Sequence, residues 1–387
     1  MFEDAKRILI IKLRHIGDVL LTVPTIRAVR ERFPDSYMVA LVNKGTEDML
    51  AGNPLLNNLV CFDRNVLKLP LQKRIYSELA FVKKIREMNF DMTIDLTGGD
   101  RAAIISLLSG ARYRIGYHLS GGFSGKRYIY TSLGILPSVQ MHTVLRNLNL
   151  VNQFGMDSED LSVYIHIPES DKDFVKDLFD RHGITETDTV VHIHPTSRWL
   201  FKCWKDEYMA EVIIWLVNKG VKVVVTSAPY KKEMDKAKRI LSSVPELRTL
   251  NSKLIDLCGR VTLKQLAAIS KLCNLFFGID SAPMHIAAAF GTPVVVLFGP
   301  SGAFDWGPWD NNYRLEFGVR GSELKNPYQK RNGVQTFGKH TVIQRDWDCI
   351  PCGEDGCDGT KRSRCLEDIG VNEVMEQIEK VITQIQT

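Results

Sequence analysis

The feature that most constrains this 387-residue chain is a regular alternation of short apolar runs with longer amphipathic runs. Residues 7–13 are apolar and β-branched, which is typical of a buried strand. Residues 19–33 then place apolar side chains at helical spacing, with charges on the opposite face. Similar strand-like and helix-like runs follow through residue 155. Such alternation predicts an α/β fold with a parallel, doubly wound sheet.

The pattern starts again at residues 189–194 and continues to residue 300, which predicts a second Rossmann-like domain. Residues 165–184 form the expected connector. Thr262 is the predicted N-cap of one helix in this half. We expect domains over residues 1–170 and 186–350, followed by a cysteine-containing loop and a C-terminal helix over 351–387. A cleft between two such domains is a common place for a ligand.

The composition is that of an ordinary water-soluble globular protein, with 44% hydrophobic and 25% charged residues. The first residues mix charges and do not resemble a signal peptide. No apolar run approaches the length of a membrane-spanning helix. We therefore expect a cytoplasmic protein, attached at most to a membrane surface by charge. The net charge of +5 does not by itself imply a nucleic-acid partner.

One long stretch is unusual in its charge. Residues 101–156 contain no Asp or Glu, yet they include Arg101, Arg112, Arg114 and Arg146. A surface of one sign attracts anions. An unevenly charged, solvated face is an equally good interpretation of this stretch.

Polar residues follow the first predicted strand directly. Arg14, His15, Gly17 and Asp18 lie side by side between the strand at 7–13 and the helix that follows. In open α/β sheets, ligands bind outside the carboxyl ends of the strands. Gly17 allows a tight turn or a close approach of a ligand. Asp18 is either a functional carboxylate or the N-cap of the next helix, and the two roles are compatible.

Three loops of the second half are predicted to lie at the corresponding edge of their sheet. In the first, Thr196 and Ser197 can donate hydroxyl hydrogen bonds to phosphate, and Lys202 adds a point charge suited to phosphate. The alternative is a pair of capping residues and a surface lysine.

The second loop holds Asp280, followed by Ser281 and a helix that contains His285. Pro283 suits the first turn of that helix, and a helix N-terminus is a ready anion site. Asp280 is then a candidate for binding sugar hydroxyls, or alternatively an N-cap beside a core histidine. In the third loop, residues 226–233, Glu233 is a candidate contact to a ribose.

Some classes of site are disfavoured by the sequence. No GxGxxG or GxxxxGK[ST] motif follows a predicted strand, and no GxSxG occurs. Four of the eight cysteines cluster at Cys349, Cys352, Cys357 and Cys365. Reduced thiols, a zinc site and a redox pair all remain open. Reduced thiols are favoured, because the usual zinc-ligand spacings are only half met.

Three segments carry a resemblance to a known family. These are "KLRHIGDVLLTVPTIRAVRERFP", "SRWLFKCW" and "GIDSAPMHIAAAFGTPVVVLFGP". They resemble the bacterial heptosyltransferases of glycosyltransferase family 9, and in particular the branch-forming members. The resemblance runs over nearly the whole chain. It implies a GT-B fold in which two Rossmann-like doubly wound domains face a cleft, with residues 1–170 binding the acceptor and residues 186–350 the nucleotide sugar.

The resemblance also implies the reaction. Heptose would pass from ADP-L-glycero-D-manno-heptose to a heptose of the lipopolysaccharide inner core, with inversion at the anomeric carbon and without a metal or cofactor. Peripheral contact with the inner face of the inner membrane is then expected, and a nucleic-acid partner is not.

The family motifs suggest roles for several candidate residues. Asp18 matches the general base, Thr196, Ser197 and Lys202 match the donor diphosphate loop, and Asp280 and His285 match the donor segment. With Glu233 and Ser281 from the loops described above, the donor-binding set is Thr196, Ser197, Lys202, Glu233, Asp280, Ser281 and His285. The acceptor-binding set rests on the charge of the first loop and of residues 101–156, and comprises Arg14, His15, Arg101, Arg112 and Arg114. Two alternatives remain open: a related GT-B enzyme that uses another nucleotide sugar, and a non-catalytic protein that only binds a nucleotide or anion.

Overall fold

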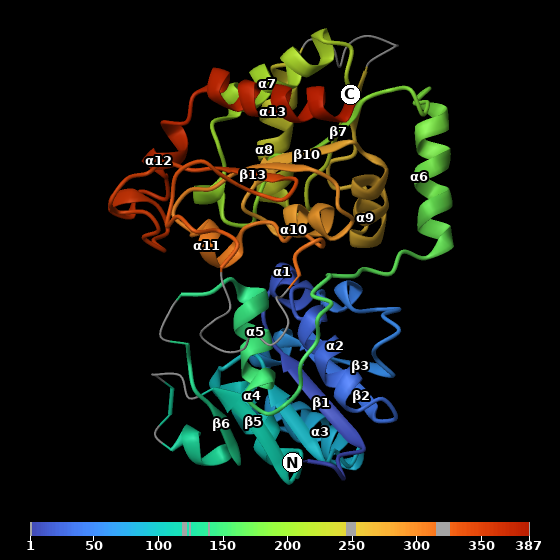
Figure 1. Cartoon of the computed structure of the whole chain (residues 1–387), viewed down its shortest axis with the longest axis vertical. Helices are drawn as coiled ribbons and strands as arrows, with labels where there is room; N and C mark the ends of the chain where they lie inside the picture. The colour runs from blue at the N-terminus through green and yellow to red at the C-terminus, as the bar shows by residue number, and fades with distance from the viewer. Residues whose placement is uncertain are drawn as a thin grey trace. The chain divides into compact units, whose positions relative to one another are not determined.

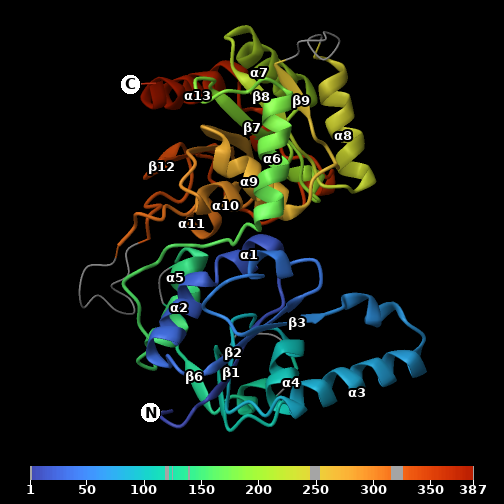
Figure 2. The same cartoon turned by 90° about the vertical axis from the view of Figure 1, so that its right-hand side faces the viewer.

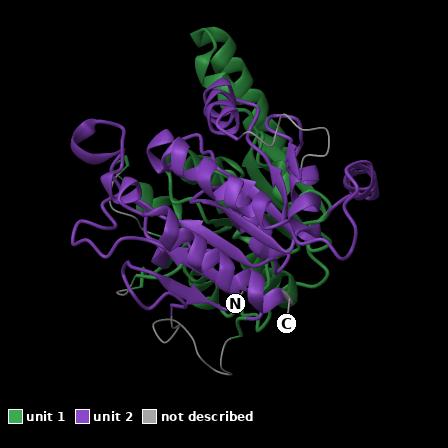
Figure 3. Ribbon diagram, turned by 90° about the horizontal axis from the view of Figure 1, so that it is seen from above, with its two compact units in different colours: residues 1–166, 313–325 green, residues 167–312, 326–387 purple. Residues whose placement is uncertain are grey.

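The computed structural model describes residues 2–117, 122–123, 125–137, 140–244, 253–314 and 326–386. The chain divides into two compact units (Figure 3). Unit 1 comprises residues 1–166 and 313–325, and unit 2 comprises residues 167–312 and 326–387. Each unit is built around one sheet with its own buried core, and each is described separately below (Figure 1).

The sheet of unit 1 is parallel, with strand order β3-β2-β1-β4-β5-β6. Its strands are β1 (Arg7–Lys12), β2 (Tyr37–Asn43), β3 (Asn58–Phe62), β4 (Met92–Asp95), β5 (Tyr113–Tyr117) and β6 (Ser132–Gly134). The strand order reverses between β1 and β4, which is the switch point where doubly wound sheets bind ligands. The loops after β1 and β4 therefore frame the natural site of this unit.

The helices of unit 1 connect these strands. They are α1 (Ile16–Leu20), α2 (Val23–Arg32), α3 (Leu71–Glu87), α4 (Asp100–Leu108) and α5 (Thr143–Asn152), with 3-10 turns η1 (Glu47–Met49), η2 (Arg64–Lys68) and η3 (Lys126–Ile129). Two expectations need correction. The single helix expected over residues 19–33 is two helices, because Pro24 lies in the first turn of α2, where its missing N–H needs no helical partner. Residues 46–52, one of the helix-like runs predicted before residue 155, contain only the turn η1.

Unit 2 repeats the same winding. Its strands are β7 (Val190–His194), β8 (Lys222–Val225), β9 (Leu254–Asp256), β10 (Leu275–Ile279), β11 (Val294–Leu297), β12 (Gln335–Phe337) and β13 (His340–Ile343). The order is β12-β13-β11-β10-β7-β8-β9, and only β12 is antiparallel to its neighbour. The switch point lies between β7 and β10. The predicted α/β class with parallel sheets is confirmed.

The helices of unit 2 include the C-terminal helix of the chain. They are α6 (Glu169–Arg181), α7 (Asp206–Asn218), α8 (Lys231–Ser242), α9 (Leu263–Leu272), α10 (Ala282–Ala289), α11 (Ala303–Trp306), α12 (Arg364–Glu367) and α13 (Val371–Gln386), with 3-10 turns η4 (Leu200–Lys202) and η7 (Cys357–Gly359). Helix α6 packs against α9. Helix α13 contacts α7 and β10 and buries Val374 and Ile378 in the core. The Trp204 indole N–H donates to the carbonyl of Ile369 at 3.1 Å, which ties the segment before α13 to the same core.

The N-cap predicted at Thr262 is confirmed. Its hydroxyl accepts from the N–H of Gln265 at 3.1 Å, and the Gln265 side chain accepts from the N–H of Thr262 at 3.0 Å. This is a reciprocal capping box. We expect Thr262→Ala to lower the free energy of unfolding by about 1 kcal/mol, measured by denaturant titration. Thr262→Ser keeps the hydroxyl and should lose much less; equal losses in the two variants would contradict the capping role.

Candidate active site

The loop after β1 presents Asp18 on the short helix α1. The backbone N–H of His15 donates to the Asp18 carboxylate at 3.3 Å. His15 is the N-cap residue and Asp18 is the third helical residue, so the alternative that Asp18 itself is the N-cap is wrong. Its carboxylate instead makes the reciprocal bond of a capping box, because it reaches back to the start of the helix. Asp18 is half-buried, beside the buried Gly17.

Lys12, the last residue of β1, is a part of this site that the sequence analysis missed. Its ammonium is buried and donates to the carbonyl of Leu96 at 3.0 Å and to Asn147 Oδ1 at 3.1 Å. Burial lowers the pKa of Lys12 from 10.5 to about 8. The Asp18 carboxylate acts against this shift by attraction, while Arg146 and Arg14 add to it by repulsion. The available signal was a lysine that directly follows the four apolar residues 8–11 of the strand.

Thr97 ties the two loops of the switch point together. Its hydroxyl accepts from the N–H of Leu13 at 2.8 Å, and its carbonyl accepts from the Arg14 guanidinium at 3.1 Å. From β2, the Asn43 side chain donates to the carbonyl of Arg14 at 3.0 Å. The backbone that carries Arg14 and His15 is thus fixed on both sides, while both side chains are exposed.

Two other carboxylates lie near the end of β4, and each is already engaged. Buried Asp95 accepts from the Tyr130 hydroxyl at 2.6 Å and from the N–H of Thr97 at 2.7 Å. Burial is the main cause that raises the pKa of Asp95, and these hydrogen bonds oppose it. Asp100 forms an ion pair with Lys126 at 3.6 Å. Compared with Asp95, the half-buried Asp18 is much better placed to meet a substrate.

The predicted acceptor-binding arginines do not gather in one place. Arg14 lies at the switch point. Arg101, on α4, donates to Glu78 at 2.9 Å and stacks on the Phe62 ring. Arg112 and Arg114 lie at the start of β5, at the amino ends of the strands, whereas Arg14 lies beyond the carboxyl end of β1.

Both of these last arginines have structural partners of their own. Arg112 is paired with Asp4. Arg114 donates to the carbonyls of Ile129 and Ala111, each at 2.6 Å. The stretch without carboxylates therefore does not form a single anion-binding surface. Within residues 101–156, Arg146 is the arginine whose charge acts on Lys12.

In unit 2, the loop after β7 is tied to the start of α8. The Thr196 hydroxyl donates to the Glu233 carboxylate at 3.1 Å, and both residues are buried. Burial raises the pKa of Glu233, although the Thr196 hydrogen bond and the charge of Arg198 oppose the shift. Ser197 accepts from the N–H of Trp199 at 3.2 Å. The structure thus brings Thr196 and Glu233 together, a pairing that the sequence analysis did not anticipate.

The same loop also meets the loop after β10. The Lys202 ammonium lies 2.5 Å from the Asp280 carboxylate, and the Ser301 hydroxyl donates to the same carboxylate oxygen. Asp280 is buried, whereas Lys202 retains about a quarter of its side-chain exposure. The arrangement presents a cation and a hydroxyl around one carboxylate at the switch point between β7 and β10. Such a group can bind both phosphate and sugar hydroxyls.

The remaining donor candidates lie on α10, which follows β10. Ser281 is the N-cap residue and donates to the carbonyl of Ile279 at 3.2 Å. Pro283 lies in the first turn, as predicted, and His285 is buried within the helix. All seven donor candidates therefore lie in the loops or helix starts that follow β7, β8 and β10.

A buried hydrogen-bond network supports these loops from below. The two ring nitrogens of His192 contact the hydroxyls of Ser270 and Thr226 at 2.9 and 2.8 Å, and His194 Nδ1 contacts the Thr226 hydroxyl at 2.8 Å. Burial lowers the pKa of His194 to about 3. Both histidines are thus neutral hydrogen-bonding residues near the end of β7, rather than charged ligand-binding groups.

The eight cysteines are unpaired thiols. Burial raises the pKa of Cys365 to about 11, with smaller effects in the same direction from Cys357, Cys352 and Cys349. In the part of the chain that the structure describes, no three His, Cys, Asp or Glu side chains are placed to hold a metal ion. Within the same residues, no helix is both long and apolar enough to span a bilayer.

Comparison with known proteins places this geometry in a family. The sequence model of glycosyltransferase family 9 (heptosyltransferase) matches residues 78–332. The chain is 30% identical over 303 residues to lipopolysaccharide heptosyltransferase 3 of Escherichia coli. The aligned region covers 78% of this chain and 85% of that protein.

Two solved structures share the fold. The glycosyltransferase family 9 protein of Veillonella parvula aligns with a TM-score of 0.76 and 22% identity, over 98% of this chain and 97% of that one. The E. coli heptosyltransferase WaaC, solved with ADP-2-deoxy-2-fluoro heptose, aligns with a TM-score of 0.66 and 17% identity, over 97% and 99% of the two chains.

Two Rossmann-like units with polar groups at both switch points are the architecture of the GT-B fold, which this chain shares with the solved glycosyltransferases. The match of the family model and the extent of the identity make the assignment more specific. The chain belongs to glycosyltransferase family 9, the heptosyltransferases.

Glu233 generates a pH-dependent prediction. Because its pKa is raised in the folded state, the ionised carboxylate destabilises the fold, and this cost appears as the pH rises through the folded pKa. Glu233→Gln keeps an acceptor for Thr196 but cannot ionise. Its melting temperature relative to the wild type should therefore increase between about pH 4 and about pH 8. Glu211→Gln, on the exposed face of α7, is the control; a difference that stays constant with pH would contradict the prediction.

Proposed function

We propose that this protein transfers heptose from ADP-L-glycero-D-manno-heptose to a heptose of the lipopolysaccharide inner core, as a branch and with inversion at the anomeric carbon. The observation that carries the proposal is Asp18, a half-buried carboxylate at the switch point of unit 1, with Lys12 and Arg14 in electrostatic range. The similarity to E. coli lipopolysaccharide heptosyltransferase 3 supports the acceptor class. The fold shared with WaaC, solved with an ADP-heptose analogue, supports the donor class.

In the proposed reaction, an acceptor hydroxyl attacks the anomeric carbon of the donor heptose. Asp18 takes the hydroxyl proton as the new glycosidic bond forms, and the bond to the ADP oxygen breaks. One base suffices, because ADP leaves as an already stable anion. Arg14 and His15, exposed on the same loop, would bind anionic groups of the acceptor.

The donor would bind at the switch point of unit 2. Lys202 and the first turn of α10 would hold the diphosphate without a metal ion. Lys202 supplies a positive charge, and the helix N-terminus supplies free N–H groups and the positive end of the helix dipole. Asp280 and Ser301 would then be free to bind hydroxyls of the nucleotide sugar. We further propose that the enzyme works in the cytoplasm, in contact with the inner face of the inner membrane, where a lipid-linked acceptor is available.

Asp18→Asn tests the base directly. The amide keeps the size and can still accept from the His15 N–H, so the melting temperature should stay close to that of the wild type. Loss of a positioned base should lower the turnover rate by about 10²–10⁴, measured as ADP release from ADP-heptose and heptose-deficient core. Asp100→Asn removes a carboxylate near the end of β4 and should keep most of the activity. A folded Asp18→Asn enzyme with normal turnover would show that Asp18 only caps α1.

Lys202→Ala tests the diphosphate contact. A hydrogen bond to a charged group contributes about 1.5–3 kcal/mol, so ADP should bind about tenfold to a hundredfold more weakly by calorimetry. Lys205→Ala, a change in the neighbouring lysine that contacts Tyr208, is the matched control.

A double variant separates two explanations for that loss. If Lys202 only neutralises Asp280, then Lys202→Ala combined with Asp280→Asn should restore ADP binding. If Lys202 contacts the diphosphate, as proposed, the double variant stays weak.

A further inference from the structure

The most unusual surface of unit 1 lies on α3. Helix α3 extends from unit 1 (Figure 2). Its C-terminal part is anchored in the core through buried Ile85. In contrast, residues 71–76 are all exposed. The exposed first half of this 17-residue helix is too short to be a stable helix by itself in water, so contact with a further surface would stabilise it.

The exposed half carries an apolar stripe. Leu71, Ile75 and Leu79 are four residues apart and therefore share one face of the helix. Their exposed fractions are 70%, 50% and 63%. The preceding turn η2 and its end add exposed Leu67 and Leu69. Single exposed apolar residues are ordinary, but a contiguous group of this size marks an interaction surface.

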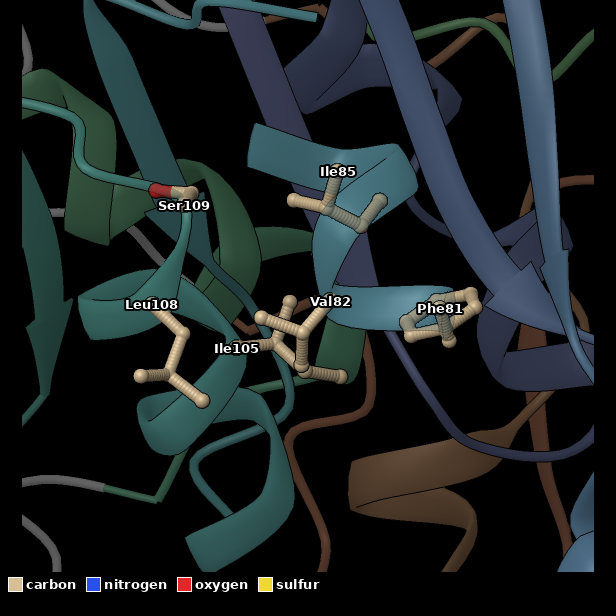
Figure 4. A pocket seen from close by; sticks show the side chains of 6 residues that line it. All are labelled: Phe81, Val82, Ile85, Ile105, Leu108 and Ser109. Atoms are coloured by element: carbon tan, nitrogen blue, oxygen red, sulfur yellow. The ribbon is translucent and has the colours of Figure 1, made fainter. Parts of the chain in front are cut away.

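The apolar surface continues onto α4. Figure 4 shows an apolar hollow where the two helices meet, lined by Phe81, Val82 and Ile85 of α3, by Ile105 and Leu108 of α4, and by Ser109 just after α4. Ile104 and Leu107 of α4 are exposed as well. The stripe is thus part of a broader apolar face of the two helices.

The same segment is strongly basic. Residues 64–87 hold seven Lys and Arg but only two acidic residues, Glu78 and Glu87, so their net charge equals that of the whole chain. Glu78 is paired with Arg101, and Glu87 lies 3.7 Å from Lys83. Basic side chains such as Lys68 and Lys73 have long stems that let their charge reach away from an apolar surface.

We propose that residues 67–79, together with the exposed face of α4, dock this enzyme onto the surface of an anionic phospholipid bilayer. An apolar stripe on a Lys- and Arg-rich helix is suited to the boundary between headgroups and acyl chains, because apolar burial and charge attraction act together. The proposal deepens the proposed function, since it names the surface by which an enzyme with a lipid-linked acceptor would meet the membrane. Turn η2 immediately follows β3, at the same edge of the sheet as the Asp18 loop.

Vesicle co-sedimentation tests the docking surface. We expect the full-length protein to bind vesicles of equal parts phosphatidylglycerol and phosphatidylcholine, and to bind vesicles of phosphatidylcholine alone at least about tenfold more weakly. Binding should fall as salt rises from about 0.1 M to about 1 M, because screening shortens the reach of the charges. Failure of the wild type to bind the anionic vesicles would overturn the proposal.

Two variants assign the binding to this surface. Leu71→Ser with Ile75→Ser and Leu79→Ser should weaken vesicle binding at least about tenfold. Lys68→Glu with Lys73→Glu should weaken it and flatten its salt dependence, and this variant keeps the test valid if the first one misfolds. Ile135→Ser with Leu272→Ser is the control, because these side chains are equally exposed elsewhere. Wild-type binding by both surface variants would overturn the proposal.

Two further measurements distinguish membrane docking from an effect on the transfer reaction and from dimer formation. The vesicles contain neither donor nor acceptor, so the binding result does not depend on the transfer reaction. With a soluble, lipid-free core acceptor, the triple Ser variant should turn over like the wild type. If gel filtration instead shows a wild-type dimer that the triple variant converts to a monomer, the stripe is covered by a second copy and the membrane proposal fails.

Discussion

The reversal of winding beside the first strand of each sheet is the constraint on which both sites depend. The segments that follow β1 and β4 lie on opposite faces of the first sheet, and those that follow β7 and β10 lie on opposite faces of the second. The carboxyl ends of these strands therefore remain uncovered. The middle of each strand is buried and largely apolar, as in residues 8–11 of β1. Polar side chains that can meet a ligand are therefore found at the strand ends and just beyond them, where the candidate residues Asp18, Thr196 and Asp280 lie.

This confinement brings ionisable groups to the boundary of the core, and each one needs partners there. Lys12 has a carbonyl and an amide oxygen, Asp95 has Tyr130, and Glu233 has Thr196. A buried charge without such partners would be strongly unfavourable. The partners also join neighbouring loops, since Thr196 with Glu233 links the loops after β7 and β8. The groups that stabilise the strand ends are thus the groups that hold the site in shape.

The sequence predicted the features that depend on periodicity and on local chemistry. Apolar runs located the strands, and the residues just after them located Asp18, Lys202 and Asp280 at strand ends. Thr262 was recognisable because a capping box is a local motif. The break between α1 and α2 was missed, although Pro24 signalled it. The hairpin of β12 and β13 was also missed, because its strands are short and β12 is only partly buried.

Other features depend on which end of a strand a residue occupies, or on pairings across the sheet. Arg112 and Arg114 were grouped with Arg14 because a count of charges over residues 101–156 does not show at which end of β5 a residue lies. Lys12 was overlooked because buried lysines are rare and nothing local reveals Asn147 as its partner. The pairings of Thr196 with Glu233 and of Lys202 with Asp280 join residues 37 and 78 positions apart. Only the folded sheet brings such residues into contact.

The electrostatics of the proposed base follow from Lys12. Lys12 is a buried ammonium within electrostatic range of Asp18, Arg14 and Arg146, and its attraction to Asp18 acts against the pKa shift that burial causes. Burial lowers the pKa of Lys12 from 10.5 to about 8, so this ammonium loses its charge in much less alkaline solution than an exposed lysine does. Loss of the Lys12 proton in alkaline solution would remove a cation near Asp18, and the first loop would then be organised by the hydrogen bonds of His15, Thr97 and Asn43.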